Sequence, residues 1–305
     1  MNDLREDKIV KKLGVNLIIF LFAFAAGYIL VPKFAMISEK SRSPIAPVAD
    51  MPQLKVEAVK ELETIDTNEL WKRTEESSPK MKMLETGEGF QPDEIAAQNG
   101  ESFLGLFEEN GDYILRSTKV HVKTVKIDMK YEYDGGTGIR NNVSVNGKNE
   151  PLFLLKNASK IRAGKVTCLF RGLSFKDALI VAYPDKSQAD VMTNLGKGFL
   201  QEYEFGGKSY ALKVIEARDE QDNPITALFL EGDGKRQLLY AALEANVNLG
   251  NLYWVGDLDR DGKLDFYMSL GVTDAIYDSY LFLSSEAGDD KLVKVATVFH
   301  AGSGC

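Results

Sequence analysis

The sequence has few of the residues from which metal and catalytic motifs are usually built, with two cysteines and two histidines among 305 residues. Cys168 and Cys305 are too far apart in the chain for a zinc motif or a redox CxxC. His121 and His300 have no partner at a spacing typical of a metal site or a triad, and the sequence contains no G-x-S-x-G. No enzyme class is therefore identified by motif.

The chain also lacks an excess of basic residues. It carries 37 Lys and Arg against 45 Asp and Glu, a net charge of −8. Proteins that bind nucleic acids usually present a basic patch, so the balance argues against a nucleic-acid partner. The composition is otherwise that of a folded globular protein, with 44% hydrophobic and 27% charged residues.

One long apolar run is present, at residues 13–32, and it contains no charged residue. Twenty helical residues span about 30 Å, the thickness of a bilayer's hydrocarbon core. Four basic residues lie in the segment 1–12, so the positive-inside rule predicts a cytoplasmic tail there, a signal anchor at 13–32 and an extracytoplasmic remainder. A cleaved signal peptide is the alternative, because Ala23-Phe24-Ala25 resembles a signal-peptidase site. The apolar run continues beyond that site, which favours a single-pass anchor in the cell membrane.

Residues 33–94 are expected to form a linker with short helices. The start of this segment is rich in Ser and Pro, and its end contains Ser, Pro and Gly, which is typical of flexible connections. Residues 53–63 place apolar side chains at helical spacing. Asp66 and Glu69 resemble a capping box and predict a second helix to about Arg73. The sequence therefore predicts a short helical stalk above the membrane.

Residues 95–305 are expected to form a β domain at the periplasmic side or on the cell surface. Short apolar runs alternate with turn residues, and no long helical pattern separates them. This density of strands predicts a mainly β fold, an antiparallel sandwich or a barrel-like domain. The expected strands are 103–107, 113–116, 119–129, 152–155, 166–170, 179–183, 199–205, 209–215, 226–230, 237–242, 252–255, 264–270, 279–284 and 292–299.

The expected strand 119–129 has apolar residues at both even and odd positions. Val120 and Val122 share one parity, whereas Val125, Ile127 and Met129 share the other. A regular strand cannot place both sets on one face. The pattern predicts either a bulge near Lys123-Thr124 or a strand that passes from one sheet to another.

Residues 257–265 read Asp-Leu-Asp-Arg-Asp-Gly-Lys-Leu-Asp, with carboxylates at loop positions 1, 3, 5 and 9. Such carboxylates can converge on one hard cation, and glycine at position 6 permits the sharp reversal of a Ca²⁺ loop. The expected Ca²⁺ ligands are the side chains of Asp257, Asp259, Asp261 and Asp265 and the backbone carbonyl of Lys263.

An EF-hand would require a bidentate Glu at position 12, which here is Met268, and would be flanked by helices. Both flanks of this loop instead read as strands. The segment resembles the D-x-D-x-D-G-x-x-D calcium loops of FG-GAP or VCBS-like repeats, which implies a Ca²⁺ site between strands. A single copy is present, so the repeated blades of a propeller are not expected. The stretch Leu281–Ser285 and the final Gly304-Cys305 are similar to tails of uncharacterised bacterial membrane-anchored proteins, which implies an envelope protein without indicating an activity.

Two further features leave alternatives open. Export would allow Cys168 and Cys305 to form a disulfide, and otherwise one thiol is buried and one is terminal. Tyr253 and Trp254 could line a carbohydrate site or belong to the core. Gly206-Gly207-Lys208-Ser209 resembles the end of a phosphate-binding loop, but its strand context predicts a hairpin turn.

The sequence thus predicts a membrane-anchored calcium-binding protein, a binding or scaffolding module of the cell envelope with a structural Ca²⁺ and an envelope protein or glycan as partner. The alternative is an envelope hydrolase, conceivably acting on glycans, whose catalytic residues are dispersed.

Overall fold

The computed structural model describes residues 62–66, 80–128, 137–171, 194–244, 247–271 and 276–302. The predicted tail 1–12, the anchor 13–32 and nearly all of the two stalk helices lie outside these ranges. Among the described residues, no helix is long and apolar enough to cross a membrane. The described chain contains strands and connections but no helix.

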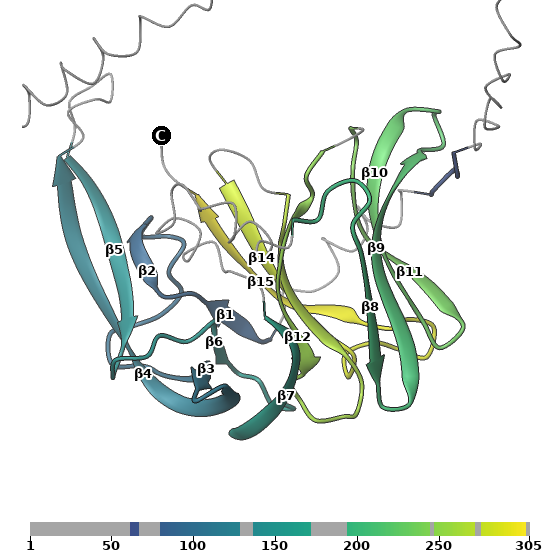
Figure 1. The fold of residues 1–305 in the computed structure, drawn as a ribbon. Coiled ribbons are helices and arrows are strands. Elements are labelled where there is room, and N and C mark those ends of the chain that lie inside the picture. The colour runs from purple at the N-terminus through teal and green to yellow at the C-terminus, as the bar shows by residue number, and fades with distance from the viewer. Residues whose placement is uncertain are drawn as a thin grey trace, which may run out of the picture. The chain divides into compact units, whose positions relative to one another are not determined.

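The strands fall into two antiparallel sheets (Figure 1). Their bounds are β1 Lys82–Leu84, β2 Gly87–Phe90, β3 Ser102–Glu109, β4 Asp112–Asp128, β5 Thr137–Val145, β6 Leu154–Lys156, β7 Gly164–Arg171, β8 Leu200–Phe205, β9 Lys208–Arg218, β10 Pro224–Gly232, β11 Lys235–Ala242, β12 Gly250–Asp257, β13 Asp265–Leu270, β14 Ile276–Leu283 and β15 Lys294–Gly302.

The larger sheet has 11 strands in the order β1-β6-β3-β4-β7-β12-β13-β14-β15, with β5 and β2 added beside β4. The sheet curls until its two end strands, β1 and β15, lie next to each other. Phe90 and Phe299 meet edge to face near this junction, with ring centroids 5.6 Å apart. The sheet is therefore a nearly closed, barrel-like structure.

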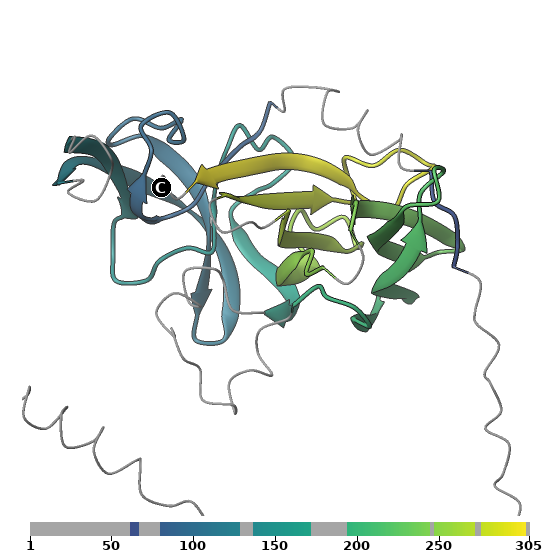
Figure 2. The same ribbon diagram turned by 90° about the horizontal axis from the view of Figure 1, so that it is seen from above.

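Strands β12 to β14 are buried on both faces, which explains their continuous apolar sequences. Tyr253, Tyr267 and Leu281 pack in the core that the curled sheet encloses. The alternate residues Met268 and Phe282 pack on the opposite face, against the second sheet. In Figure 2 the yellow strands β14 and β15 lie between the blue strands and the green four-stranded sheet. The predicted Ca²⁺ loop, residues 257–265 and here called the metal loop, therefore joins β12 to β13 at the centre of the fold.

The second sheet has the order β11-β10-β9-β8. One face contributes apolar side chains, Leu212 and Leu228 among them, to the core shared with β12 to β14. The other face carries Phe229, which packs with Ile65 from the segment 62–66. Ile65 donates its amide to the carbonyl of Arg218 at 2.8 Å, which fixes this segment to the end of β9.

The prediction of a mainly β, antiparallel fold is confirmed for the described residues. The expected linker 33–94 extends too far, because residues 82–90 form β1 and β2. Met83 and Leu84 are buried and pair with β6, and β2 pairs with β5. β5 was also not expected, and the strand predicted at 179–183 lies outside the described residues.

The predicted bulge near Lys123-Thr124 is wrong, because β4 and β5 pair without a register shift from Val120 to Asp128. The alternative of a strand that passes from one sheet to another is also wrong, because β3, β4 and β5 belong to the same 11-stranded sheet, in which β4 changes partners. β4 pairs with β3 as far as Lys119 and with β5 from Val120 onward. Ile127 is 40% exposed, so the side chains at the odd positions of this segment do not have to face a core.

Candidate metal centre

The predicted Ca²⁺ loop connects β12 to β13 as a long hairpin turn. Gly256 and Asp265 form the last pair of the ladder, and the chain reverses between them. Leu258 and Leu264 are buried and anchor both arms of the turn. Arg260 and Gly262 adopt positive φ angles of 65° and 83°, conformations that tighten the reversal.

The turn brings three carboxylates together. Asp257, Asp259 and Asp265 each offer an oxygen, and these oxygens lie within 4.8 Å of one another. Asp265 is fully buried and Asp257 is 7% exposed, whereas Asp259 is partly exposed. Three anionic oxygens at this spacing form a donor set for a hard cation.

Backbone amides of the turn orient the carboxylates. Asp257 accepts hydrogen bonds from the amides of Asp261 and Gly262, both at 3.1 Å. Asp265 accepts one from the amide of Leu258 at 2.7 Å, which ties the end of the turn to its beginning. The carboxylates are therefore held in place by the turn that also brings them together.

The adjoining end of β14 adds two serines to the site. Ser284 donates its amide to Asp265 Oδ1 at 2.9 Å, and its hydroxyl lies 3.1 Å from the same oxygen. The same hydroxyl lies 3.0 Å from both carboxylate oxygens of Asp261. Ser285 donates its hydroxyl to Asp259. A third strand thus contacts three of the four loop carboxylates.

Burial raises the pKa values of the three clustered carboxyls. Burial raises the pKa of Asp265 well above its usual value, and the neighbouring Asp259 raises it further. Burial also raises the pKa of Asp257 and of Asp259, with an added contribution from the negative charge of Asp261. Close, poorly hydrated carboxylates favour protonation unless a cation is present. This electrostatic cost is what a bound metal ion would remove.

Neighbouring loops pack around the turn. Arg260 donates to the carbonyls of Arg162 and Ala163, at 2.5 and 3.1 Å, between β6 and β7. Gly206, in the β8–β9 turn, is so close that a Cβ there would lie 2.7 Å from the carbonyl oxygen of Gly262. The metal loop therefore contacts both the large sheet and the second sheet.

The structure brings together three of the four predicted side-chain ligands. Asp261 is outside the group of three and is joined to it through the hydroxyl of Ser284. Lys263 donates its amide to Asp261 at 2.9 Å, and its predicted role as a carbonyl ligand stays a prediction. Ser284 and Ser285, which directly follow β14, were not predicted, because they reach the site only through the pairing of β13 with β14.

None of the other predicted features belongs to the carboxylate cluster. Tyr253 and Trp254 are 2% and 0% exposed, so they pack in the interior rather than line a surface site. Cys168 on β7 carries a half-buried thiol whose pKa burial raises to about 11. Cys305 lies outside the described residues, so the Cys168–Cys305 disulfide stays a prediction. Gly206 and Gly207 form the expected hairpin turn between β8 and β9.

Comparison of the chain with family models, with curated proteins and with solved structures gives no match. The interpretation of the site consequently depends on its own residues and geometry.

Proposed function

We propose that this chain is a membrane-anchored, extracytoplasmic binding or scaffolding protein of the cell envelope, and that Ca²⁺ in the 257–265 loop stabilises it. The observation that carries the proposal is the convergence of Asp257, Asp259 and Asp265 within 4.8 Å. These residues would bind the ion directly. Asp261 and the carbonyl of Lys263 would complete the coordination.

The donor set favours Ca²⁺ over softer metals. The three clustered residues supply oxygen ligands alone, and neither His nor Cys belongs to their group. Zinc and copper sites usually include nitrogen or sulfur, whereas Ca²⁺ takes six to eight oxygens with flexible geometry. Mg²⁺ demands a smaller and more regular octahedral shell, which a turn of alternating carboxylates fits less well.

A bound ion would link β12, β13 and β14 at one point. The cation would hold both ends of the β12–β13 turn, and Ser284 and Ser285 connect the same carboxylates to β14. The loops that contact the turn through Arg260 and Gly206 would be fixed with it. The ion would thereby set the shape of the surface at this end of the domain.

The proposed compartment is supported by the apolar segment 13–32 and the basic residues before it. Calcium outside the cytoplasm is plentiful enough to occupy weak sites. Protease protection in spheroplasts, whose inner membrane stays sealed, and in lysed spheroplasts tests the orientation. The proposal requires digestion of the 80–302 region in sealed spheroplasts and fails if that region is digested only after lysis.

Titration of the metal-free full chain with Ca²⁺, in a non-ionic detergent, tests whether the chain binds this ion. Isothermal titration calorimetry is expected to give one Ca²⁺ per chain, and Asp259→Asn is expected to weaken binding strongly. Equal heats for the two proteins would refute the loop as the binding site.

The hydrolase alternative receives little support from the described residues. A glycosidase needs two carboxyl groups across a cleft. The described surface pocket contains a single carboxylate, Asp233, which pairs with Lys208 at 2.6 Å. His300 does bond Asp278 at 2.7 Å, but this pair lies outside the pocket and the His300 side chain is 71% exposed. A binding role therefore agrees better with the geometry.

A further inference from the structure

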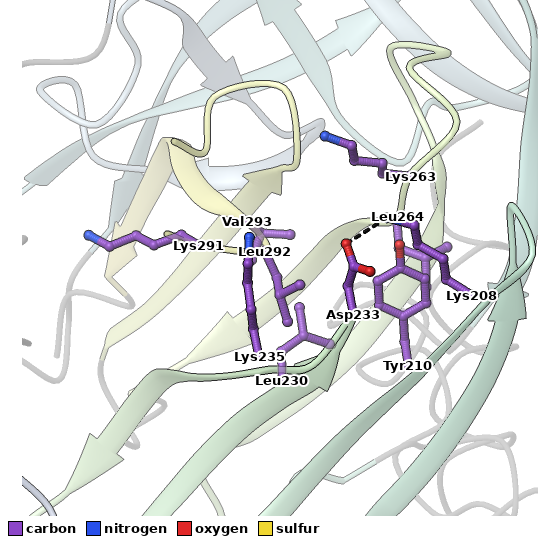
Figure 3. A pocket seen from close by; sticks show the side chains of 10 residues that line it. All are labelled: Lys208, Tyr210, Leu230, Asp233, Lys235, Lys263, Leu264, Lys291, Leu292 and Val293. Carbon is purple, nitrogen blue, oxygen red and sulfur yellow. Dashed lines mark hydrogen bonds and ion pairs between the residues drawn. The ribbon is translucent and has the colours of Figure 1, made fainter. Parts of the chain in front are cut away.

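A shallow pocket lies where the metal loop meets the second sheet (Figure 3). The pocket is small, with a volume of about 40 Å³, and it opens to solvent. Leu230, Leu264 and Val293 are buried and form part of its apolar lining. Segments from both sheets and from the β14–β15 loop line it, so the pocket depends on their relative positions.

The polar lining is mostly cationic, although the whole chain has a net charge of −8. The lining contains four lysines and one carboxylate, Asp233, and no arginine is among the lining residues. The lining residues are Lys208, Tyr210, Leu230, Asp233, Lys235, Lys263, Leu264, Lys291, Leu292 and Val293. Such a concentration of positive charge attracts an anion.

The lysines are not equivalent. Lys208 pairs with Asp233, and both side chains remain partly exposed, so an arriving anion can compete for this ammonium group. Lys235 is held at the pocket by a hydrogen bond to the backbone carbonyl of Asp289. Figure 3 shows the ammonium group of Lys291 turned away from the others. The ammonium group of Lys263 points away from Asp233 and Tyr210 in Figure 3, so Lys208 and Lys235 are the groups best placed to bind one ligand, with the positive charge of Lys263 beside them.

The pocket shares residues with the metal loop. Lys263 and Leu264 belong to the loop and also line the pocket. The carboxylate of Asp261 acts electrostatically on Tyr210, another lining residue, together with Asp233. Without a cation, the loop carboxylates therefore oppose an anion in the pocket. A bound Ca²⁺ would cancel this repulsion and fix the position of Lys263.

We propose that the pocket binds a phosphate group, held by the ammonium groups of Lys208 and Lys235 and by the Tyr210 hydroxyl and attracted by the nearby charge of Lys263, and that Ca²⁺ in the adjacent loop strengthens this binding. Several ammonium groups around a small volume match a compact dianion. Carboxylates are more often bound through the paired N–H groups of arginine, which this pocket lacks. Only the Ca²⁺ dependence rests on the proposed function, because the lysines and the pocket exist independently of the metal.

The full chain in a non-ionic detergent is titrated with phosphate probes and followed by ³¹P NMR. Methyl phosphate is used with Ca²⁺, since inorganic phosphate precipitates with this ion, and both are used after chelation. Dimethyl phosphate, a singly charged diester, represents the backbone of a phosphate polymer. Stronger binding of the monoester indicates free phosphate or a terminal phosphate group, and equal binding of the diester indicates a polymer backbone.

The expected dissociation constant is on the order of 1 mM, as for a few charge-assisted hydrogen bonds. Lys235→Met is expected to weaken binding about tenfold, and Ca²⁺ binding by the same variant should be unchanged. Lys165→Met is the control, because Lys165 is an exposed lysine paired with Asp112 on the large sheet and does not line the pocket. This control should bind phosphate as the unaltered chain does.

Two results would overturn the phosphate site: no binding of any probe at about ten times the expected constant, or equal weakening by Lys235→Met and Lys165→Met. Phosphate binding that Ca²⁺ does not change would overturn the coupling alone. If the chain binds phosphate but no Ca²⁺, the proposed structural metal fails and the phosphate site stands.

Discussion

Ser284 and Asp265 are joined twice across the β13–β14 hairpin, through the amide of Ser284 at 2.9 Å and through its hydroxyl at 3.1 Å, both to Asp265 Oδ1. The hydroxyl also reaches Asp261. A carboxylate at the end of the metal loop is thereby fixed by a strand outside that loop. Stability of the hairpin and binding of the metal should consequently respond together to changes at either residue.

Removal of Ca²⁺ should lower the melting temperature of the full chain. A ligand present at 100 times its dissociation constant stabilises the folded state by about 2.7 kcal/mol, and for a domain of this size that is roughly 5–10 °C. Differential scanning fluorimetry with Ca²⁺ and with excess chelator measures the difference. Mg²⁺ should restore less of it than Ca²⁺, and identical melting temperatures with and without chelator would contradict a structural ion.

Asp259→Asn should weaken Ca²⁺ binding roughly tenfold or more, because calcium loops tune their affinity through ligand charge. Asp259 is the most exposed of the three clustered residues, so its replacement should perturb the core least. Asp222→Asn is a matched control in a different acidic turn, at a positive φ of 67° that asparagine tolerates. A similar loss of affinity in both variants would show that overall charge, and not the loop, governs binding.

Ser284→Ala should destabilise the protein by about 1–3 kcal/mol, because the carboxyl oxygens of Asp265 and Asp261 lose a shared donor. Ca²⁺ affinity should fall as well. Chemical denaturation of the chelated and Ca²⁺-loaded chain separates the two effects. Ser117→Ala, an exposed serine on β4, should change neither quantity, and a Ser284→Ala protein as stable as this control would exclude the bridging role.

The stabilisation by Ca²⁺ should increase with pH. Burial raises the pKa of Asp265 well above its usual value, so the metal-free folded state binds more protons than the unfolded state. Stability of that form is therefore expected to decrease as the pH rises from about 4, the ordinary aspartate pKa, through the raised value. A bound Ca²⁺ would hold the ionised carboxylates and should remove this decrease.

Melting curves between about pH 4 and 7.5 in buffers that do not chelate Ca²⁺ test this dependence. The difference between loaded and metal-free protein should be smallest at the acidic end. A constant difference across the range would show that the clustered carboxyls do not titrate with a raised pKa.

Thiol labelling should detect no free cysteine in denatured, non-reduced protein if Cys168 and Cys305 form a disulfide. Reduction should then expose both thiols. In native protein, the half-buried Cys168 with a pKa raised to about 11 should react slowly even when it is reduced. Labelling of both cysteines without reduction, in denaturant, would disprove the disulfide.

The carboxylate cluster could be predicted because its members are close together in the sequence. The spacing of Asp257, Asp259 and Asp265 and the reversal at Gly262 are contained in nine consecutive residues. Ser284 reaches the site only through the register of β13 with β14, in which Phe266 pairs with Phe282. Hairpin register depends on side-chain packing across the sheet, which a single sequence does not specify.

The missed strands have a similar explanation. β5 contains Asn141 and Asn142, and β2 consists of Gly, Glu and Phe, so neither has the composition of a strand. They form because β4 offers an edge that they extend. The lysine pocket was equally inaccessible to sequence reasoning, since its residues come from four separate segments between 208 and 293.

The contact between β1 and β15 bears on the order of folding. The first strand of the large sheet lies beside the last one, so the sheet cannot close until the final strand has been synthesised. Contacts between such distant segments form slowly, because the intervening chain loses entropy when they meet. A shortened chain that ends before Lys294 would leave β1 and β14 with uncovered edges, and such edges promote aggregation.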